Sequence, residues 1–164
     1  MSSRIIFDWM LDKFRIRDSV GTVYDGYATM TDNTDTTTVT TGGDTYAIQG
    51  TFTNSLNGFT AVDGGIRCNN PTEEEYIINY SYTFTCSSPN EIIYFGAQVL
   101  NGEVTCLHLK PVFVKTAGES YTVSGICKPT ICENAVLSLI TSADDDGAVI
   151  TVTDAEVYLR KRYR

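Results

Sequence analysis

The sequence predicts an all-β protein, a jelly-roll-like antiparallel β-sandwich preceded by a short N-terminal docking segment. From Thr45 onward, short runs rich in Val, Ile, Tyr, Phe and Thr recur between Gly, Pro, Asn and Asp, which is typical of short strands joined by tight turns. The segment Tyr76–Cys86 alternates apolar and polar side chains throughout. The turn sequences "LNGE" and "DDDG" permit the positive φ angles that tight hairpins require.

The alternation in Tyr76–Cys86 predicts one buried face, with Ile78, Tyr80, Tyr82 and Phe84 pointing inward. The same reasoning predicts further strands along the chain, and together they favour two packed sheets. They are Thr45–Phe52, Gly65–Cys68, Glu91–Leu100, Glu103–Leu109, Val112–Lys115, Ser120–Cys127, Ala135–Ile140, Val149–Thr153 and Ala155–Tyr163.

The segment "IIYFGAQVL" is apolar on both faces. Ile93, Phe95, Ala97 and Val99 occupy one face, while Ile92, Tyr94 and Leu100 occupy the other. A strand that is apolar on both sides requires cover on both sides, so we expect a second sheet on one and a neighbouring subunit on the other.

The first part of the chain differs from the rest, which divides it into residues 1–44, an N-terminal arm with a Thr-rich connector, and residues 45–164, the sandwich. A helical face in "SSRIIFDWMLDKF" is too short to be stable alone and must dock on something. We expect it to anchor the protein to a partner, although packing on its own sandwich as a strand or helix is the alternative. The predicted anchor residues are Ile5, Ile6, Trp9, Met10 and Phe14.

The run "DNTDTTTVTTGGD" at 32–44 favours extended backbone but offers only Val39 to a hydrophobic core. An extended segment of this kind gains main-chain hydrogen bonds when it adds to the edge of a sheet in another chain. We therefore expect an exchanged or partner-contacting strand, with a disordered linker as the alternative. The predicted contact residues are Thr36, Thr38, Val39 and Thr40.

Composition argues against several classes of partner. The net charge of −8 disfavours nucleic acid and anionic membranes, which attract clustered Lys and Arg. The basic cluster "RKRYR" at 160–164 is either solvated strand-end charge or a contact for an acidic partner. Neither a signal peptide nor a membrane span is expected, and the odd number of cysteines, 5, favours free thiols.

The residues that could carry chemistry are few, and we expect neither an enzyme nor a bound metal or cofactor. Cys106 and the single histidine, His108, share a strand face, but packing in the sheet is the simpler interpretation. Cys127 and Cys132 flank a turn and could form a bridge, although free thiols are preferred. The acidic clusters at 73–75 and 144–146 lack the spacing of a calcium loop and are interpreted as solvated turns.

A short docking segment, a Gly- and Thr-rich connector and an acidic all-β domain together resemble the trimeric decoration (cement) proteins and head fibres of tailed bacteriophages. The ending "ITVTDAEVYLRKRY" looks like the last hairpin of trimeric jelly-roll heads. The resemblance implies a homotrimer that binds the major capsid protein on the virion surface and decorates or stabilises the capsid, after synthesis in the host cytoplasm. The alternative is a carbohydrate- or receptor-binding tip module of a phage fibre, with a host glycan as its partner.

Overall fold

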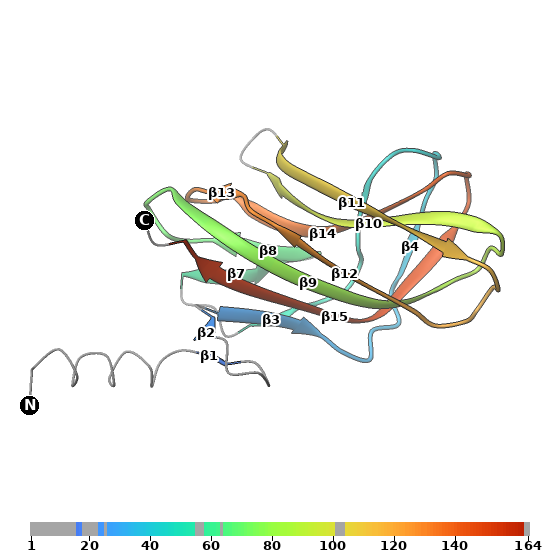
Figure 1. Cartoon of the computed structure of the whole chain (residues 1–164), viewed down its shortest axis with the longest axis horizontal. Coiled ribbons are helices and arrows are strands. Elements are labelled where there is room, and N and C mark those ends of the chain that lie inside the picture. The colour runs from blue at the N-terminus through green and yellow to red at the C-terminus, as the bar shows by residue number, and fades with distance from the viewer. Residues whose placement is uncertain are drawn as a thin grey trace, which may run out of the picture.

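The structure is a computed structural model that describes residues 16–17, 23–24, 26–54, 58–62, 64–100 and 104–162, the side chains of 16–17, 23–24, 54 and 104–108 excepted. Every regular element in these ranges is a β-strand, and the strands form two packed antiparallel sheets (Figure 1). The predicted all-β sandwich is confirmed. The predicted N-terminal docking segment lies outside the described residues.

The first sheet has the strand order β11 (Val104–Val114), β10 (Glu91–Leu100), β14 (Val136–Ala143), β8 (Gly65–Cys68) and β7 (Phe59–Val62), with β5 (Tyr46–Ala47) also paired to β14. The second has the order β12 (Tyr121–Cys127), β9 (Glu74–Cys86), β15 (Val149–Lys161), β3 (Gly26–Met30) and β6 (Thr53–Asn54). In this second sheet β4 (Thr36–Thr38) also pairs with β15, and β13 (Thr130–Ile131) with β9. The short strands β1 (Ile16–Arg17) and β2 (Val23–Tyr24) pair only with each other.

The chain crosses repeatedly between the sheets, as in a jelly roll. It passes from β9 to β10 and from β11 back to β12, so β11 and β12 are the edge strands on the same side of the sandwich. The Lys110 amine of β11 donates to the Ser124 carbonyl of β12 at 2.8 Å. This contact links the two sheets along their shared edge.

The core lies between β9 and β10, where the predicted inward side chains meet. Ile78, Tyr80, Tyr82 and Phe84 are all buried, which confirms the predicted phase of β9. Phe84 packs on Phe95 of the opposite sheet with ring centroids 4.2 Å apart. The Tyr82 hydroxyl donates to the Gly96 carbonyl, so this buried polar group is satisfied across the interface between the sheets.

β15 is one strand where the sequence predicted two. Its register with β9 shifts between Val152 and Asp154, and this β-bulge reverses the alternation. Val152 before the bulge and Ala155 after it are both buried. The bulge therefore keeps both halves of a long strand facing the core, although the sequence pattern changes phase.

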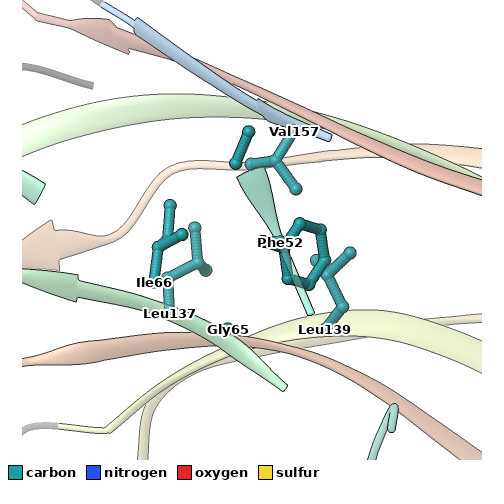
Figure 2. Close-up of a pocket in the computed structure, with 7 residues that line it drawn as sticks. Phe52, Gly65, Ile66, Leu137, Leu139 and Val157 are labelled. Carbon is teal, nitrogen blue, oxygen red and sulfur yellow. The ribbon is translucent and has the colours of Figure 1, made fainter. Parts of the chain in front are cut away.

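Packing is less complete at one place between the sheets. Phe52, Ile66, Leu137, Leu139 and Val157 surround a gap with an empty volume of about 160 Å³ (Figure 2). The gap has no room for the centre of a water-sized sphere. A Cβ atom built on the adjacent Gly65 would lie 2.4 Å from the Leu137 carbonyl oxygen. The gap is a packing imperfection and not a ligand site, and a larger residue at position 65 would not fill it without moving the backbone.

Candidate partner-binding surface

The predicted anchor residues cannot be placed on the fold. Ile5, Ile6, Trp9, Met10 and Phe14 all lie outside the described residues. Their role in docking remains a prediction.

The threonine run belongs to the sandwich in this structure. Thr36–Thr38 form β4, which pairs with β15 of the same chain. Val39 is 0% exposed and lies in the core, so it is not available to a partner and its predicted role as a contact residue is corrected. Thr36, Thr38 and Thr40 are exposed, and their predicted contact with a partner remains a prediction.

Side-chain contacts from distant parts of the chain hold the run in place. The Asn33 amide donates to the Val152 carbonyl at 2.9 Å, beside the bulge in β15. The backbone N–H of Gly42 donates to the Asp146 carboxylate at 2.6 Å. A Cβ atom at position 42 would lie 2.2 Å from the Asp144 carbonyl oxygen, so this close approach requires glycine. Residues 26–44 therefore pack with the sandwich, whereas the sequence division placed its start at residue 45.

An exposed apolar surface lies on the outer face of β10 and β11. Its residues face away from the core, and register pairs Ile92 with Phe113, Tyr94 with Pro111, and Gly96 with Leu109. Phe113 is 57% exposed, the largest value among the large hydrophobic side chains in the described part of the chain. We call this surface the apolar patch; it consists of Ile92, Tyr94, Leu109, Pro111 and Phe113.

The apolar patch matches the expected second face of "IIYFGAQVL". Ile93, Phe95, Ala97 and Val99 are fully buried on the inner face of β10, as predicted. On the outer face Ile92 and Tyr94 are only partly buried, and Leu100 is 36% exposed. The contribution of Phe113 was not predicted, because its position beside Ile92 depends on the register of β11.

Among the described side chains, the predicted chemical candidates do not assemble into a reactive site. Cys106 and His108 lie on β11, but their side chains are outside the described residues. No disulfide joins Cys127 to Cys132, and Cys68 and Cys86 are free thiols. Across the described ranges, no group of three or more His, Cys, Asp or Glu side chains is arranged to hold a metal ion.

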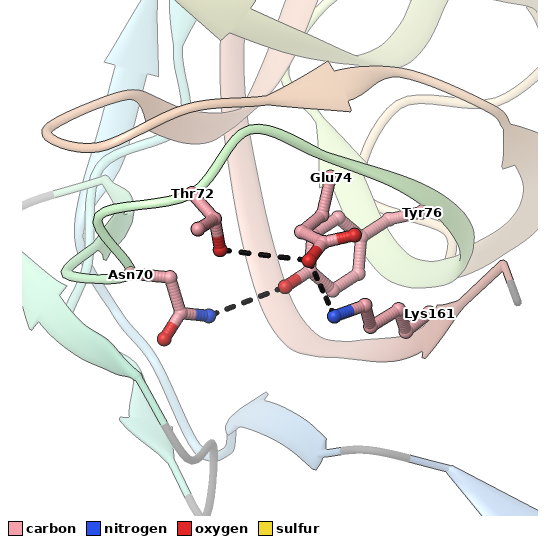
Figure 3. Close-up of polar contacts among 5 residues, drawn as sticks. All are labelled: Asn70, Thr72, Glu74, Tyr76 and Lys161. Carbon is pink, nitrogen blue, oxygen red and sulfur yellow. Dashed lines mark hydrogen bonds and ion pairs between the residues drawn. The ribbon is translucent and has the colours of Figure 1, made fainter.

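Glu74 and Glu75, at the start of β9, lie beside Lys161 and Arg162, at the end of the neighbouring strand β15. The Lys161 amine contacts the Glu74 carboxylate at 2.5 Å, and Thr72 donates to the same carboxylate oxygen at 3.5 Å (Figure 3). Arg162 contacts Glu75 at 3.3 Å. Lys161 and Arg162 therefore have intrachain carboxylate partners, which favours the structural interpretation over contact with an acidic partner for these two residues of "RKRYR".

Glu91 is a buried carboxyl group at the other end of the sandwich. It is 5% exposed and accepts a hydrogen bond from the backbone N–H of Asp145 at 3.3 Å. Burial raises the pKa of Glu91, and the nearby negative charges of Asp145 and Asp144 act in the same direction. This hydrogen bond thus joins the acidic turn at 144–146 to the start of β10.

No family model matches the chain. No curated protein matches it either. Among solved structures, murine APRIL at pH 8.5 is similar with a TM-score of 0.52 and 8% identity, over 78% of this chain and 98% of that chain. The Eiger TNF from S. frugiperda is similar with a TM-score of 0.50 and 8% identity, over 84% of this chain and 92% of that chain. The globular domain of the zebrafish complement 1qA protein is similar with a TM-score of 0.50 and 12% identity, over 86% of this chain and 98% of that chain.

These likenesses show the fold and nothing finer, because the identities are low. The sandwich is a jelly roll of the kind seen in TNF-like and complement 1q-like domains. A fold of this kind hosts many functions, so the function must be argued from the surfaces. In the described residues, no helix is long and apolar enough to cross a bilayer.

Proposed function

We propose that this protein is a structural virion protein that assembles as a homotrimer, binds the major capsid protein and decorates or stabilises a phage capsid. The apolar patch is the observation that supports self-association. Phe113, Ile92, Tyr94, Pro111 and Leu109 lie on one outer sheet face, which the rest of the described chain leaves partly open. Clustered apolar surface of this kind marks sites where proteins meet.

The free energy available from the patch is sufficient to matter. Removing apolar surface from water contributes about 25 cal/mol per Å², so covering a large aromatic side chain contributes roughly 1.5–3 kcal/mol. Aromatic residues at the centre of a contact often dominate its binding free energy. We therefore expect Phe113 to be the main contact residue between subunits.

The trimeric state follows from the resemblance to trimeric jelly-roll heads and is consistent with the rule that soluble oligomers close into symmetric rings. Attachment to the capsid is assigned to the N-terminal segment, because a Trp-centred apolar cluster resembles the anchors of stable interfaces.

A matched pair of charge substitutions tests self-association. Phe113→Asp places a charge in the apolar patch, while Thr122→Asp places the same charge at an exposed position on β12 of the other sheet. Light scattering at micromolar concentration should give a trimer for the wild type and for Thr122→Asp, and a monomer for Phe113→Asp. A monomeric wild type, or a trimer that tolerates Phe113→Asp, would contradict the assignment.

Capsid attachment is tested separately with capsids purified from the virus that encodes the chain. Wild-type protein should co-sediment with these capsids, and electron microscopy should show added density on their surface. Deleting residues 1–14, or substituting Trp9→Ala in the full chain, should abolish co-sedimentation while the melting temperature changes little. Binding that survives both changes would refute the anchor, and a large fall in melting temperature would indicate that the segment is part of the core.

A further inference from the structure

A second surface feature lies on the opposite sheet and has a different chemistry. An open groove of about 440 Å³ crosses the outer face of β12, β9 and β15, lined by Asn79, Tyr80, Ser81, Lys110, Ser124, Gly125, Ile126 and Tyr158. Volumes in this range are typical of sites for small molecules. The groove is separate from the apolar patch, which lies on the outer face of the other sheet.

The register of the strands explains the shape of the groove. Ile126, Asn79 and Tyr158 form one row across β12, β9 and β15, and Ser124, Ser81 and Glu156 form the next row, in which the two serines are small. Neighbouring strands lie about 4.8 Å apart, so Ile126 and Tyr158 stand roughly 10 Å from each other. The larger side chains at the ends and the short ones between them leave a hollow about as wide as one pyranose ring.

Gly125 fixes the edge of the groove. A Cβ atom at this position would lie 2.2 Å from the Tyr80 ring, which is packed beneath it. The Lys110 amine reaches over from β11 and donates to the Ser124 carbonyl at 2.8 Å. The wall of the groove is therefore formed before any ligand arrives, which lowers the entropic cost of binding.

The side chains in the groove offer hydrogen bonds and an aromatic surface but little charge. Asn79 provides an amide donor and acceptor, Ser81 and Ser124 provide hydroxyl groups, and Lys110 is the only cation among the lining residues. Tyr158 stacks on Tyr27 of β3 with ring centroids 6.2 Å apart, which fixes the orientation of its ring. Its hydroxyl donates to the Glu156 carboxylate at 3.5 Å.

We infer that this groove binds a saccharide, with one pyranose ring against Tyr158 and the sugar hydroxyls bound by Asn79, Ser81 and Ser124. A sugar ring has an apolar face that suits an aromatic side chain and a rim of hydroxyls that suits amides and hydroxyls. A nucleic-acid ligand would require several cations to neutralise its phosphates, whereas Lys110 is the only cation among the residues that line the groove. The inference does not depend on trimer formation or capsid binding.

The experiment uses the full-length protein and defined sugars. An array of immobilised saccharides, including N-acetylglucosamine oligomers, galactosides, rhamnosides and sialyllactose, identifies the preferred sugar, and calorimetry with the free sugar measures the affinity. Tyr158→Ala and Ser81→Leu should each weaken binding at least about tenfold, since one removes the stacking surface and the other fills the hollow. Tyr158→Phe, which keeps the ring, should bind almost as well as the wild type.

Two controls make the result decisive. Thr122→Ala lies on the same outer face but does not line the groove and should leave the affinity unchanged. Asn79→Ala serves as a further groove variant if Ser81→Leu lowers the melting temperature. The inference is overturned if no saccharide on the array binds at millimolar concentration, or if binding is unaffected by Tyr158→Ala and Asn79→Ala. Sugar binding that persists in Phe113→Asp would separate this site from the subunit contact.

Discussion

The two outer faces of the sandwich cover the same core but present different chemistry. The outer face of β10 and β11 carries Ile92, Tyr94 and Phe113, whereas that of β9 and β12 carries Asn79, Ser81, Thr83 and Thr122. On the second face Thr83 and Thr122 lie within hydrogen-bonding distance at 3.3 Å, so neighbouring strands satisfy one another's hydroxyls. The difference supports the two proposals made above, a contact with another subunit on the first face and a hydrophilic ligand on the second.

Inner and outer positions on one strand are under different constraints. Inner positions must fill the space between the sheets, and a one-residue slip would turn all of them outward. Outer positions are constrained by their cross-strand neighbours and by what lies outside the molecule. The composition of an outer face is therefore the more informative of the two about function.

The largest expected effect is on stability, and it distinguishes the core of the sandwich from the apolar patch. Phe84→Ala should lower the free energy of unfolding by roughly 3–5 kcal/mol, because Phe84 is fully buried against Phe95 and its removal leaves a cavity. The matched change Phe113→Ala should cost about 1 kcal/mol or less when measured on dissociated protein, since an exposed side chain loses little on truncation. Urea unfolding gives both values. Equal losses would mean that Phe113 supports the fold and would remove the reason for assigning it to a subunit contact.

A smaller effect tests whether the threonine run is part of the fold. Val39→Ala should cost about 1.5–3 kcal/mol, because it removes two buried methyl-sized groups and leaves part of their volume empty. Thr38→Ala, at an exposed position one residue earlier, should be nearly neutral. If both changes are neutral, residues 32–44 do not pack on the sandwich in solution and an exchanged strand regains support.

Strong local patterns allowed parts of the fold to be predicted closely. The predicted strands Gly65–Cys68 and Glu91–Leu100 match β8 and β10, because each lies between clear turn signals. Two long strands were each predicted as a pair. Pro111 lies between the two predicted halves of β11, and an edge strand tolerates proline because the missing N–H would face solvent. In β15 the β-bulge changes the phase of the alternating pattern, so the sequence does not indicate that the two halves form one strand.

The surfaces were harder to predict because they depend on register between distant strands. The pairing of the threonine run with β15 joins residues 36–38 to residues 149–151, and nothing local in "TTT" specifies that partner. The outer apolar residues of β10 were identified from one strand alone. The groove was missed, since its row of Tyr158, Asn79 and Ile126 combines three strands and carries no sequence motif.

The acidic end of the β10 sheet gives a prediction that depends on pH. Glu91 has a raised pKa in the folded protein, so its ionised form destabilises the fold, and this cost is relieved as pH falls through that pKa toward the unfolded value. Glu91→Gln should therefore raise the melting temperature by a few degrees at neutral pH, and the advantage should shrink on acidification. Glu73→Gln, which removes one charge at an exposed position, is the control. A difference between Glu91→Gln and wild type that stays constant with pH would contradict the argument.

The smallest expected effect concerns one end of the second sheet, where Glu74 and Lys161 form an ion pair at positions in phase with the buried Tyr76. Their side chains are 28% and 33% exposed, so solvent screens the pair and the coupling should be only about 0.2–1 kcal/mol. A double-mutant cycle with Glu74→Gln and Lys161→Met measures this coupling, which should decrease further in about 1 M salt. A coupling that is zero at low salt would contradict the expectation that this ion pair stabilises the fold. A measurable, salt-sensitive coupling would instead show that the two charges stabilise each other within the chain, as the structural interpretation of Lys161 in "RKRYR" requires.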